Sequence, residues 1–377
     1  MVEQVRNIPT RLIEPFQRTS YAKTRWTKIK VIPGQVDWHG KVCLLLVYQP
    51  HNLAPSIVET CAFLRSKGYA VMVVANGGLP PAAAELLHPY VWLLLDRPNL
   101  GYDFGGYQDG IKYLNQQGLV PESMIVLNDS IWFPLNSNSD VLEQLETSEH
   151  DLCGLMLHSP ARNDEPSINR DEEKHRTGKA LRKKAEHIES YLFALRREVF
   201  VSAAFQSFWE NYAWSSSKSL TIKRGEIGLS KHMARHGLSV GAISTRHLFM
   251  DQLPQRDDDF LFKALVYSAY SDADLGEERD AILADSKDSR WRTKALDHIA
   301  RTVKRRRFNA TFPWATEQLF NTSFVKKHPG RLFQLGRIRF LEAVDAGDLF
   351  TDNEPALVEL RARVAADKLA LGPELQQ

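Results

Sequence analysis

Short apolar runs alternate with amphipathic stretches through the first part of the chain. The runs are rich in Val, Leu and Met, and each is followed by residues with helical spacing. Continuous apolar strands separated by helices are typical of a mostly parallel sheet that is covered on both faces. The pattern therefore predicts an α/β fold. The expected strands are 42–48, 69–75, 91–95 and 124–127, and the expected helices are 55–67, 82–87 and 107–117.

The pattern loosens beyond residue 143. Segment 159–184 is rich in charged residues, Asn and Pro, which predicts a mobile loop across one face of the sheet. The elements expected after it are a strand-like run at 190–200, an aromatic helix at 205–214, a helix from Glu226 to Gly237, basic helices at 272–304, and one or two short helices near the end.

These elements suggest three parts. Residues 1–37 are polar, basic and interrupted by Pro, so we expect an arm that is laid on the surface or partly mobile, with no catalytic role. We expect a catalytic α/β domain at 38–255. A mainly helical C-terminal extension is expected at 256–377.

Composition narrows the class of protein. The 377 residues carry a formal net charge of +2, so the chain as a whole does not favour a nucleic-acid partner. Cys43, Cys61 and Cys153 lie far apart in apolar segments, which indicates reduced core thiols rather than disulfides or a zinc site. No secretory signal is evident, and no apolar run reaches the roughly 20 residues of a membrane span. We therefore expect a soluble or peripheral cytoplasmic protein.

In an open α/β sheet, ligands bind beyond the carboxyl ends of the strands. The first strand ends at Tyr48, and the second is followed by Asn76, Gly77 and Gly78. An aromatic ring and an amide at these positions could stack on and hydrogen-bond a nucleotide base. The alternative is a pair of ordinary strand-end turns.

The third strand is followed by R-P-N-L-G-Y-D-F-G-G-Y, which opens a helix. Arg97 and the helix N-terminus are candidates to hold phosphate, and Asn99 and Gly101 are candidates for donor contact. Asp103 either hydrogen-bonds a ribose or sugar or forms a turn. The run lacks the G-x-G-x-x-G and G-K-[ST] patterns, which disfavours NAD and ATP enzymes.

Two carboxylates could carry chemistry. Asp129 directly follows the fourth strand and could hold Mg²⁺ or Mn²⁺ against substrate phosphates, or it could cap a turn. Glu226 is expected in the first turn of its helix, either as a general base or as a carboxylate favoured by the helix dipole. His232 and His236 have metal-ligand spacing, but H-M-A-R-H lacks the internal Glu of a zinc hydrolase, so we expect surface or supporting residues.

Several separated motifs occur in a specific order. They are R-x-N-x-G-Y-D-F-G-G-Y, L-N-D-S, S-Y-L-F-A-L-R-R-E-V-F and G-E-I-G-L-S, followed by N-A-T-F with Trp314 and by S-F-V-K. In this order they resemble the rhamnan synthesis protein F family, and the resemblance spans roughly residues 41–327. It implies a GT-A-like, Rossmann-like fold and a hexosyltransferase of bacterial polysaccharide assembly, which moves rhamnose or a related sugar.

The resemblance also implies roles for individual residues. Glu226 is similar to the catalytic Asp in the E-D-x-x-L segment of family 2 inverting transferases, and Asp129 lies where that fold carries its D-x-D metal motif. Only one acid is present here, so obligatory metal use is in doubt, and Asn128 and Ser130 could hydrogen-bond the donor instead. His247 is a candidate metal or phosphate ligand, although a lone His is more often structural.

The expected reaction is an inverting transfer from a nucleoside-diphosphate sugar to a hydroxyl of a lipid-linked or lipopolysaccharide glycan such as an O-antigen. One alternative is a module that binds a nucleotide sugar or glycan without transfer. Another is peripheral attachment to the inner face of the cell membrane, or to nucleic acid, through the basic, Trp-containing segment 290–307, for which a solvated charged face is the commoner explanation.

Overall fold

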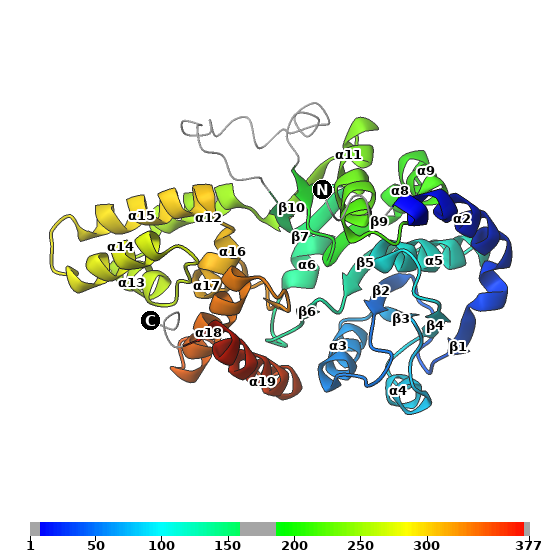
Figure 1. Cartoon of the computed structure of the whole chain (residues 1–377), viewed down its shortest axis with the longest axis horizontal. Coiled ribbons are helices and arrows are strands. Elements are labelled where there is room, and N and C mark those ends of the chain that lie inside the picture. The colour runs from blue at the N-terminus through cyan, green and yellow to red at the C-terminus, as the bar shows by residue number, and fades with distance from the viewer. Residues whose placement is uncertain (1–7, 159–185, 373–377) are drawn as a thin grey trace. The chain divides into compact units, whose positions relative to one another are not determined.

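The computed structural model describes residues 8–158 and 186–372. The chain folds into two compact units (Figure 1). The first unit contains the described residues up to Asp129, Leu145–His158, and the described residues from Glu186 to Ala242. The second contains Ser130–Gln144 and the chain from Ile243 onward. The expected loop at 159–184 lies outside the described residues, and the domain limits at 38 and 255 stay a prediction.

A mixed sheet forms the centre of the first unit. Its four central strands are parallel, in the order β4-β3-β2-β5, and antiparallel strands extend it on both sides. The described strands are β1 (Lys30–Pro33), β2 (Lys41–Val47), β3 (Ala70–Asn76), β4 (Leu93–Arg97), β5 (Ser123–Asn128), β7 (Leu152–His158), β8 (His187–Ile188), β9 (Leu192–Arg196) and β10 (Val240–Ser244). The four strands expected from the apolar runs are confirmed, and so is the α/β class.

The order of the strands creates a reversal beside β2. Helices α3 (Pro55–Ser66) and α4 (Pro81–Leu87) connect β2 to β3 and β3 to β4, and they lie on one face (Figure 1). Helix α5 (Tyr102–Gln116) lies on the other face and returns the chain to β5, on the opposite side of β2. Ligands bind where strand order reverses in this way, at the carboxyl ends of the strands. A ligand site is therefore expected at the residues that follow β2 and β5.

Glycines allow α5 to lie unusually close to the sheet. A Cβ on Gly106 would collide with Leu46 Cδ1, and a Cβ on Gly110 would lie 2.5 Å from Leu44 Cδ1. Leu44 and Leu46 belong to β2, so the two glycines, four residues apart on one helical face, fit against a single strand. This close packing holds the N-terminal turn of α5 at the edge where β2 and β5 end.

The N-terminal segment, expected as an arm laid on the surface or partly mobile, is regularly folded in its described part. Ile8–Lys28 forms helix α2, and β1 adds a strand to the sheet edge next to β4. The buried carboxylate of Asp109 in α5 pairs with Arg25 at 2.9 Å and accepts a hydrogen bond of 2.6 Å from Tyr21 Oη. Most of the described side chains of α2 are exposed, while Glu14, Tyr21 and Arg25 are buried, so a polar segment at the surface also supplies polar contacts inside the protein.

The helical segment after the sheet also differs from the expectation. It begins at α10 (Lys218–Thr221), continues through a π-helical turn at Ile222–Glu226, and ends as α11 (Ile227–Arg235). Glu226 therefore lies inside a continuous helical segment and not in a first turn. A Cβ on Gly225 would lie 2.5 Å from the Phe104 ring, so this glycine allows close packing on α5. The preceding helices are α8 (Arg197–Phe200) and α9 (Ala203–Asn211).

The second unit is mainly helical, as expected for the C-terminal region. A buried ion pair of 2.6 Å between Arg337 and Asp367 joins its last two helices. Its elements are β6 (Ile131–Trp132), α12 (Arg246–Gln252), a 3-10 turn (Leu253–Gln255), α13 (Asp258–Val266), α14 (Ala273–Ala284), α15 (Trp291–Arg305), α16 (Phe308–Thr311), α17 (Pro313–Phe320), β11 (Val325–Lys326), α18 (Arg331–Asp345) and α19 (Glu354–Leu371). Helix α6 (Val141–Glu146) and strand β10 each cross a boundary between the units.

The basic segment 290–307 does not present its Trp to solvent. Trp291 is 5% exposed and donates a 2.9 Å hydrogen bond to the carbonyl of Ile282. Lys294 pairs with Asp288, and Arg301 pairs with Glu278. The apolar face of α15 is thus part of the core, so Trp291 is not available to insert into a membrane. Among the described helices, none is both long and apolar enough to cross a bilayer.

Asp109 offers a direct test of this fold. Besides Arg25, Asp109 also pairs with Arg97, at 2.6 Å. The substitution Asp109→Asn replaces the buried carboxylate with an amide of the same shape and leaves both arginines without their shared anion. Breaking a buried ion pair from one side costs about 3–5 kcal/mol. We expect the free energy of unfolding, measured in urea, to fall by that amount.

The matched control is Glu85→Gln, which changes an exposed carboxylate on α4 of the same unit. It should change the free energy of unfolding by no more than about 0.5 kcal/mol. Equal urea midpoints for Asp109→Asn and Glu85→Gln would contradict the role given to Asp109.

Candidate functional site

The strand reversal brings the end of β5 against the end of β2. The backbone N–H of Asp129 donates to the Leu46 carbonyl at 3.1 Å, and its Oδ2 accepts hydrogen bonds from the Tyr48 N–H at 2.9 Å and from Gln49 Nε2 at 3.3 Å. The carboxylate predicted from the sequence as a metal ligand or a cap therefore does cap the turn after β2. It also lies at the reversal, where a ligand would bind.

The first turn of α5 brings Asp103 to the same edge. Asn128, the last residue of β5, is buried, and its Nδ2 donates to Asp103 Oδ2 at 3.2 Å and to Tyr107 Oη at 3.0 Å. Asn128 was expected to bind the donor, and here its amide is engaged by α5. Within L-N-D-S, the amide of Asn128 therefore binds residues of α5, and the carboxylate of Asp129 binds the turn after β2.

Glu226 is held by donors from the antiparallel side of the sheet. His187 Nε2 lies 3.1 Å from its Oε1, while the N–H and Oγ of Ser190 donate to its Oε2 at 3.1 and 2.7 Å. Burial acts to raise the pKa of Glu226, but the hydrogen bonds from His187 and Ser190 outweigh it and lower the pKa to about 2. Glu226 is therefore a firmly anionic carboxylate.

The pKa of Asp103 is shifted in the opposite direction from that of Glu226. Burial is the largest cause that raises its pKa, to about 7, and the negative charges of Asp129 and Glu226 raise it further, while Lys218 opposes the shift. The charges of two carboxylates thus act on a third at this edge, and they help to bring the pKa of Asp103 to about 7. Perturbed carboxyl groups of this kind are common at functional sites, and they also occur in structural networks.

Tyr107 and Ser190 connect the two carboxylates, although sequence reasoning did not single out either as a site residue. Tyr107 Oη, which accepts from Asn128, donates to the Ser190 carbonyl at 3.0 Å. A hydrogen-bonded path therefore runs from Asp103 through Asn128, Tyr107 and Ser190 to Glu226. Tyr107, Ser190 and His187 were missed because their partners lie on segments remote in sequence. The only signal was that Tyr107 and Ser190 fall within the ordered motifs.

Tyr48 and Asn99, both predicted to contact a donor, lie beside Gly77. Tyr48 is 55% exposed, and the Cβ position of Gly77 lies 3.5 Å from the Tyr48 ring and 3.6 Å from Asn99 Cβ. Gly77 has a φ of 81°, which suits glycine, and a side chain there would fill the space between the two residues. An open aromatic ring next to bare backbone is a suitable platform for a planar ligand.

Arg97 and Asn76 have interior roles and do not face a ligand. Each is 2% exposed, and they hydrogen-bond each other. Arg97 also donates to Asp109 at 2.6 Å and to the Leu100 carbonyl at 2.9 Å, while Asn76 donates to the Tyr102 carbonyl at 3.2 Å. The expectation that they contact a donor is therefore not supported, because their polar groups are used to fix the loop before α5.

Gly101 likewise has a structural explanation. Its φ of 77° places it in the left-handed region, and a Cβ there would collide with Trp214. It begins α5 in a place that no larger residue fits.

The remaining predicted site residues fall in the second unit. Ser130 is its first residue, and His247 lies in α12 with its Nδ1 2.9 Å from Asp251 Oδ2. Asp129 and His247, predicted together as metal ligands, belong to different units and are not placed relative to each other. Within residues 8–158 and 186–372, no three His, Cys, Asp or Glu side chains form a metal-binding group. Asp129 could therefore hold a cation only together with oxygens from a ligand or water.

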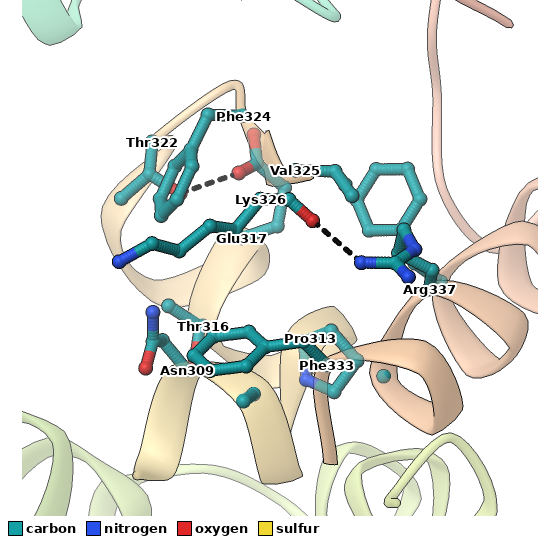
Figure 2. Close-up of a pocket in the computed structure, with 13 residues that line it drawn as sticks. Asn309, Pro313, Thr316, Glu317, Thr322, Phe324, Val325, Lys326, Phe333 and Arg337 are labelled. Atoms are coloured by element: carbon teal, nitrogen blue, oxygen red, sulfur yellow. Dashed lines mark hydrogen bonds between the residues drawn. The ribbon is translucent and has the colours of Figure 1, made fainter. Parts of the chain in front are cut away.

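The closing motifs N-A-T-F and S-F-V-K meet within the second unit. Asn309, Phe324 and Lys326 line a pocket there, together with Glu317 and Arg337 (Figure 2). Glu317 accepts from the Thr322 hydroxyl at 2.7 Å, and Arg337 donates to the Lys326 carbonyl at 2.9 Å, as the dashed lines in Figure 2 show. Glu317 thus fixes the turn before β11 and Arg337 fixes β11 itself, which gives the motifs a structural role.

The raised pKa of Asp103 predicts a pH-dependent stability. Between 3.8, the ordinary pKa, and about 7, the folded protein holds a proton that the unfolded chain has released. The stability from this group is full below about pH 4 and is lost as the pH rises through 7. Urea unfolding of wild type and Asp103→Asn from pH 4 to pH 8 should therefore favour the variant increasingly with pH. A constant difference across this range would contradict the shifted pKa.

The sequence and the fold were compared with those of known proteins. The chain is 27% identical, over 240 residues, to the protein from Sinorhizobium fredii (strain NBRC 101917 / NGR234) described as uncharacterized protein y4gN. The alignment covers 64% of this chain and 58% of that protein, so the chain spans less than two thirds of its relative.

A solved structure shows a weaker likeness. It is the mannosyltransferase PcManGT from Pyrobaculum calidifontis, in complex with GDP-Man and Mn2+, with 15% identity, coverage of 96% of this chain and 90% of that one, and a TM-score of 0.30. The model of the rhamnan synthesis protein F family matches residues 71–262, just over half of the sequence and the part that holds Asp103, Asp129 and Glu226. The chain therefore belongs to the rhamnan synthesis protein F family.

Proposed function

We propose that the chain is a glycosyltransferase with a GT-A-like fold that uses a nucleoside-diphosphate sugar. The observation that carries the proposal is the convergence of Asp103, Asp129 and Glu226 at the carboxyl edge of the parallel strands, beside the strand reversal. Family membership supports it, because the matched residues contain all three carboxylates. Rhamnose or a related sugar as the transferred group, and a cell-surface glycan hydroxyl as the acceptor, are part of the proposal through the family's name alone.

The donor would lie across the ends of β2 and β5. The exposed ring of Tyr48, with Asn99 and the bare backbone of Gly77 beside it, offers a face for the base. Tyr48 also links this face to Asp129, through the hydrogen bond from its N–H. One residue thus connects the end proposed for the base to the end proposed for the diphosphate.

The leaving diphosphate needs positive charge. A divalent cation, Mg²⁺ or Mn²⁺, would supply it when bound, as a Lewis acid on the phosphate oxygens. Asp129 would hold such an ion together with the donor's own oxygens, since the described residues form no complete metal group. Lys218, whose charge acts on Asp103, is a further source of positive charge at this edge.

The attacking hydroxyl must lose a proton as it displaces the diphosphate in an inverting reaction. Glu226 is the base proposed from the sequence. Its pKa of about 2 makes it a weak proton acceptor, whereas a base works best with a pKa near the working pH. Asp103, with a pKa of about 7, is the second candidate for this role. In that case Glu226 would act as a fixed negative charge near the developing oxocarbenium ion.

The low pKa of Glu226 also favours the alternative function, a module that binds a nucleotide sugar or glycan without transferring it. In that case the acid cluster would hydrogen-bond sugar hydroxyls and no bond would be made or broken. A cytoplasmic location, with or without peripheral membrane contact, fits either function and stays part of the proposal.

The function is tested with a panel of nucleotide sugars, with and without Mg²⁺ or Mn²⁺, by measuring release of nucleoside diphosphate and transfer to glycan acceptors. Wild type should turn over at least one donor. Loss of the general base should lower kcat by roughly 10²- to 10⁴-fold while donor binding, measured by calorimetry, survives. Comparing Glu226→Gln with Asp103→Asn identifies which carboxylate has that role.

Arg235→Gln is the control, because Arg235 is exposed at the end of the same helical segment. Its turnover should match that of wild type. Donor binding without any turnover would establish the binding module, and failure to bind every nucleotide sugar would refute both functions.

A further inference from the structure

The segment 213–217 leads directly into the helical segment that carries Glu226. Ser217 is the N-cap residue of α10, and Glu226 closes the π-helical turn that follows. Trp214 is 3% exposed and lies against Gly101, the residue before α5, while Tyr102 Oη donates to the Ser216 carbonyl at 3.2 Å. The position of this segment therefore affects both Glu226 and the turn of α5 that contains Asp103.

Two side chains of helix α2 fix the backbone of this segment. Glu14 is 2% exposed, and its Oε1 accepts hydrogen bonds from Ser215 Oγ and from the Ser216 N–H, both at 2.8 Å. Arg18 donates to the Trp214 carbonyl at 2.8 Å and pairs with Glu14 at 3.4 Å. A carboxylate is costly to bury unless donors satisfy it, so this arrangement specifies the conformation of the segment.

The other end of α2 is anchored to α5. Tyr21 and Arg25 both bind the buried carboxylate of Asp109, and the Tyr21 ring contacts Trp214 edge-to-face at 6.3 Å. Helix α2 therefore connects α5 to the segment 213–217 through polar contacts at both ends. It lies outside residues 71–262, the part matched by the family model.

We propose that Glu14 is a positioning residue for the transfer reaction, which acts through Ser215 and Ser216 to hold Lys218 and Glu226 over Asp103. The inference rests on the proposed function. Glu14 is buried and its contacts are to Ser215, Ser216 and Arg18, so in this proposal it controls the alignment of the reacting groups and leaves the donor surface at Tyr48 unaffected. Small misplacements of reacting groups lower rates strongly, by about 10²-fold for roughly 1 Å.

The test compares Glu14→Ala and Glu14→Gln with a control on the same helix. Glu14→Ala should lower kcat by on the order of tenfold or more while the KM for the donor stays within roughly threefold. Glu14→Gln should retain part of kcat, because its amide oxygen can still accept from Ser216 although the charge that pairs with Arg18 is lost. Gln17→Ala, an exposed change on α2, should match wild type.

Amide hydrogen exchange gives a readout that does not depend on activity. In Glu14→Ala, the amides of 214–226 should exchange faster while those of β2 and β3 keep their protection. A similar loss of protection across the whole first unit, or equal changes in kcat and KM, would reduce Glu14 to a general stabilising residue and overturn the proposal.

Failure of this inference can be distinguished from failure of the proposed function. If wild type transfers no sugar, the function fails, and hydrogen exchange alone then decides whether Glu14 holds the segment. If wild type is active and Glu14→Ala leaves kcat unchanged, Glu14 has no positioning role and the function stands.

Discussion

The first unit depends on one buried carboxylate. Asp109 is fully buried in α5 and meets Arg97 from the end of β4 and Arg25 from α2, with Tyr21 as a third partner. Removing charges from water is costly, so these groups are stable inside the protein only when they meet in one arrangement. That arrangement joins the sheet, the helix that carries Asp103 and the N-terminal helix. The acid cluster at the sheet edge is positioned by it, although Asp109 itself does not belong to the cluster.

The sequence predicts well what depends on local pattern. Apolar runs identified the four parallel strands, and the residues after them identified the edge where Tyr48, Asp103 and Asp129 lie. It predicts poorly what depends on distant pairing. Arg97 stands at the end of a strand, and this position suggested a phosphate ligand. No local sign in the sequence indicates its actual partner, Asp109, which lies twelve residues further along. The buried contacts of Tyr21 and Arg25 have no local signal for the same reason, because their partner Asp109 is remote from them in sequence.

Glycine has more than one structural use. Glu226 was expected in the first turn of its helix, yet the helical segment continues through Gly225, where the missing Cβ makes room for Phe104. Gly101 does begin a helix, and there a positive φ and close packing coincide. Only the neighbour that fills the space distinguishes the two uses, and that neighbour is remote in sequence. The same limit explains why the donors to Glu226 from His187 and Ser190 could not be foreseen.

The acid cluster sets an electrostatic condition on its ligand. Glu226 stays ionised because three donors stabilise its charge, and that charge, with Asp129, helps to raise the pKa of Asp103. A proton on Asp103 is thus favoured first by burial and then by the negative charges near it. A bare diphosphate would add more, so it would be repelled unless positive charge arrived with it or was supplied by Lys218. A sugar hydroxyl, which can donate hydrogen bonds to carboxylates, meets no such barrier. The edge is therefore suited to a ligand that brings hydroxyl groups to the carboxylates and whose phosphates are matched by a cation.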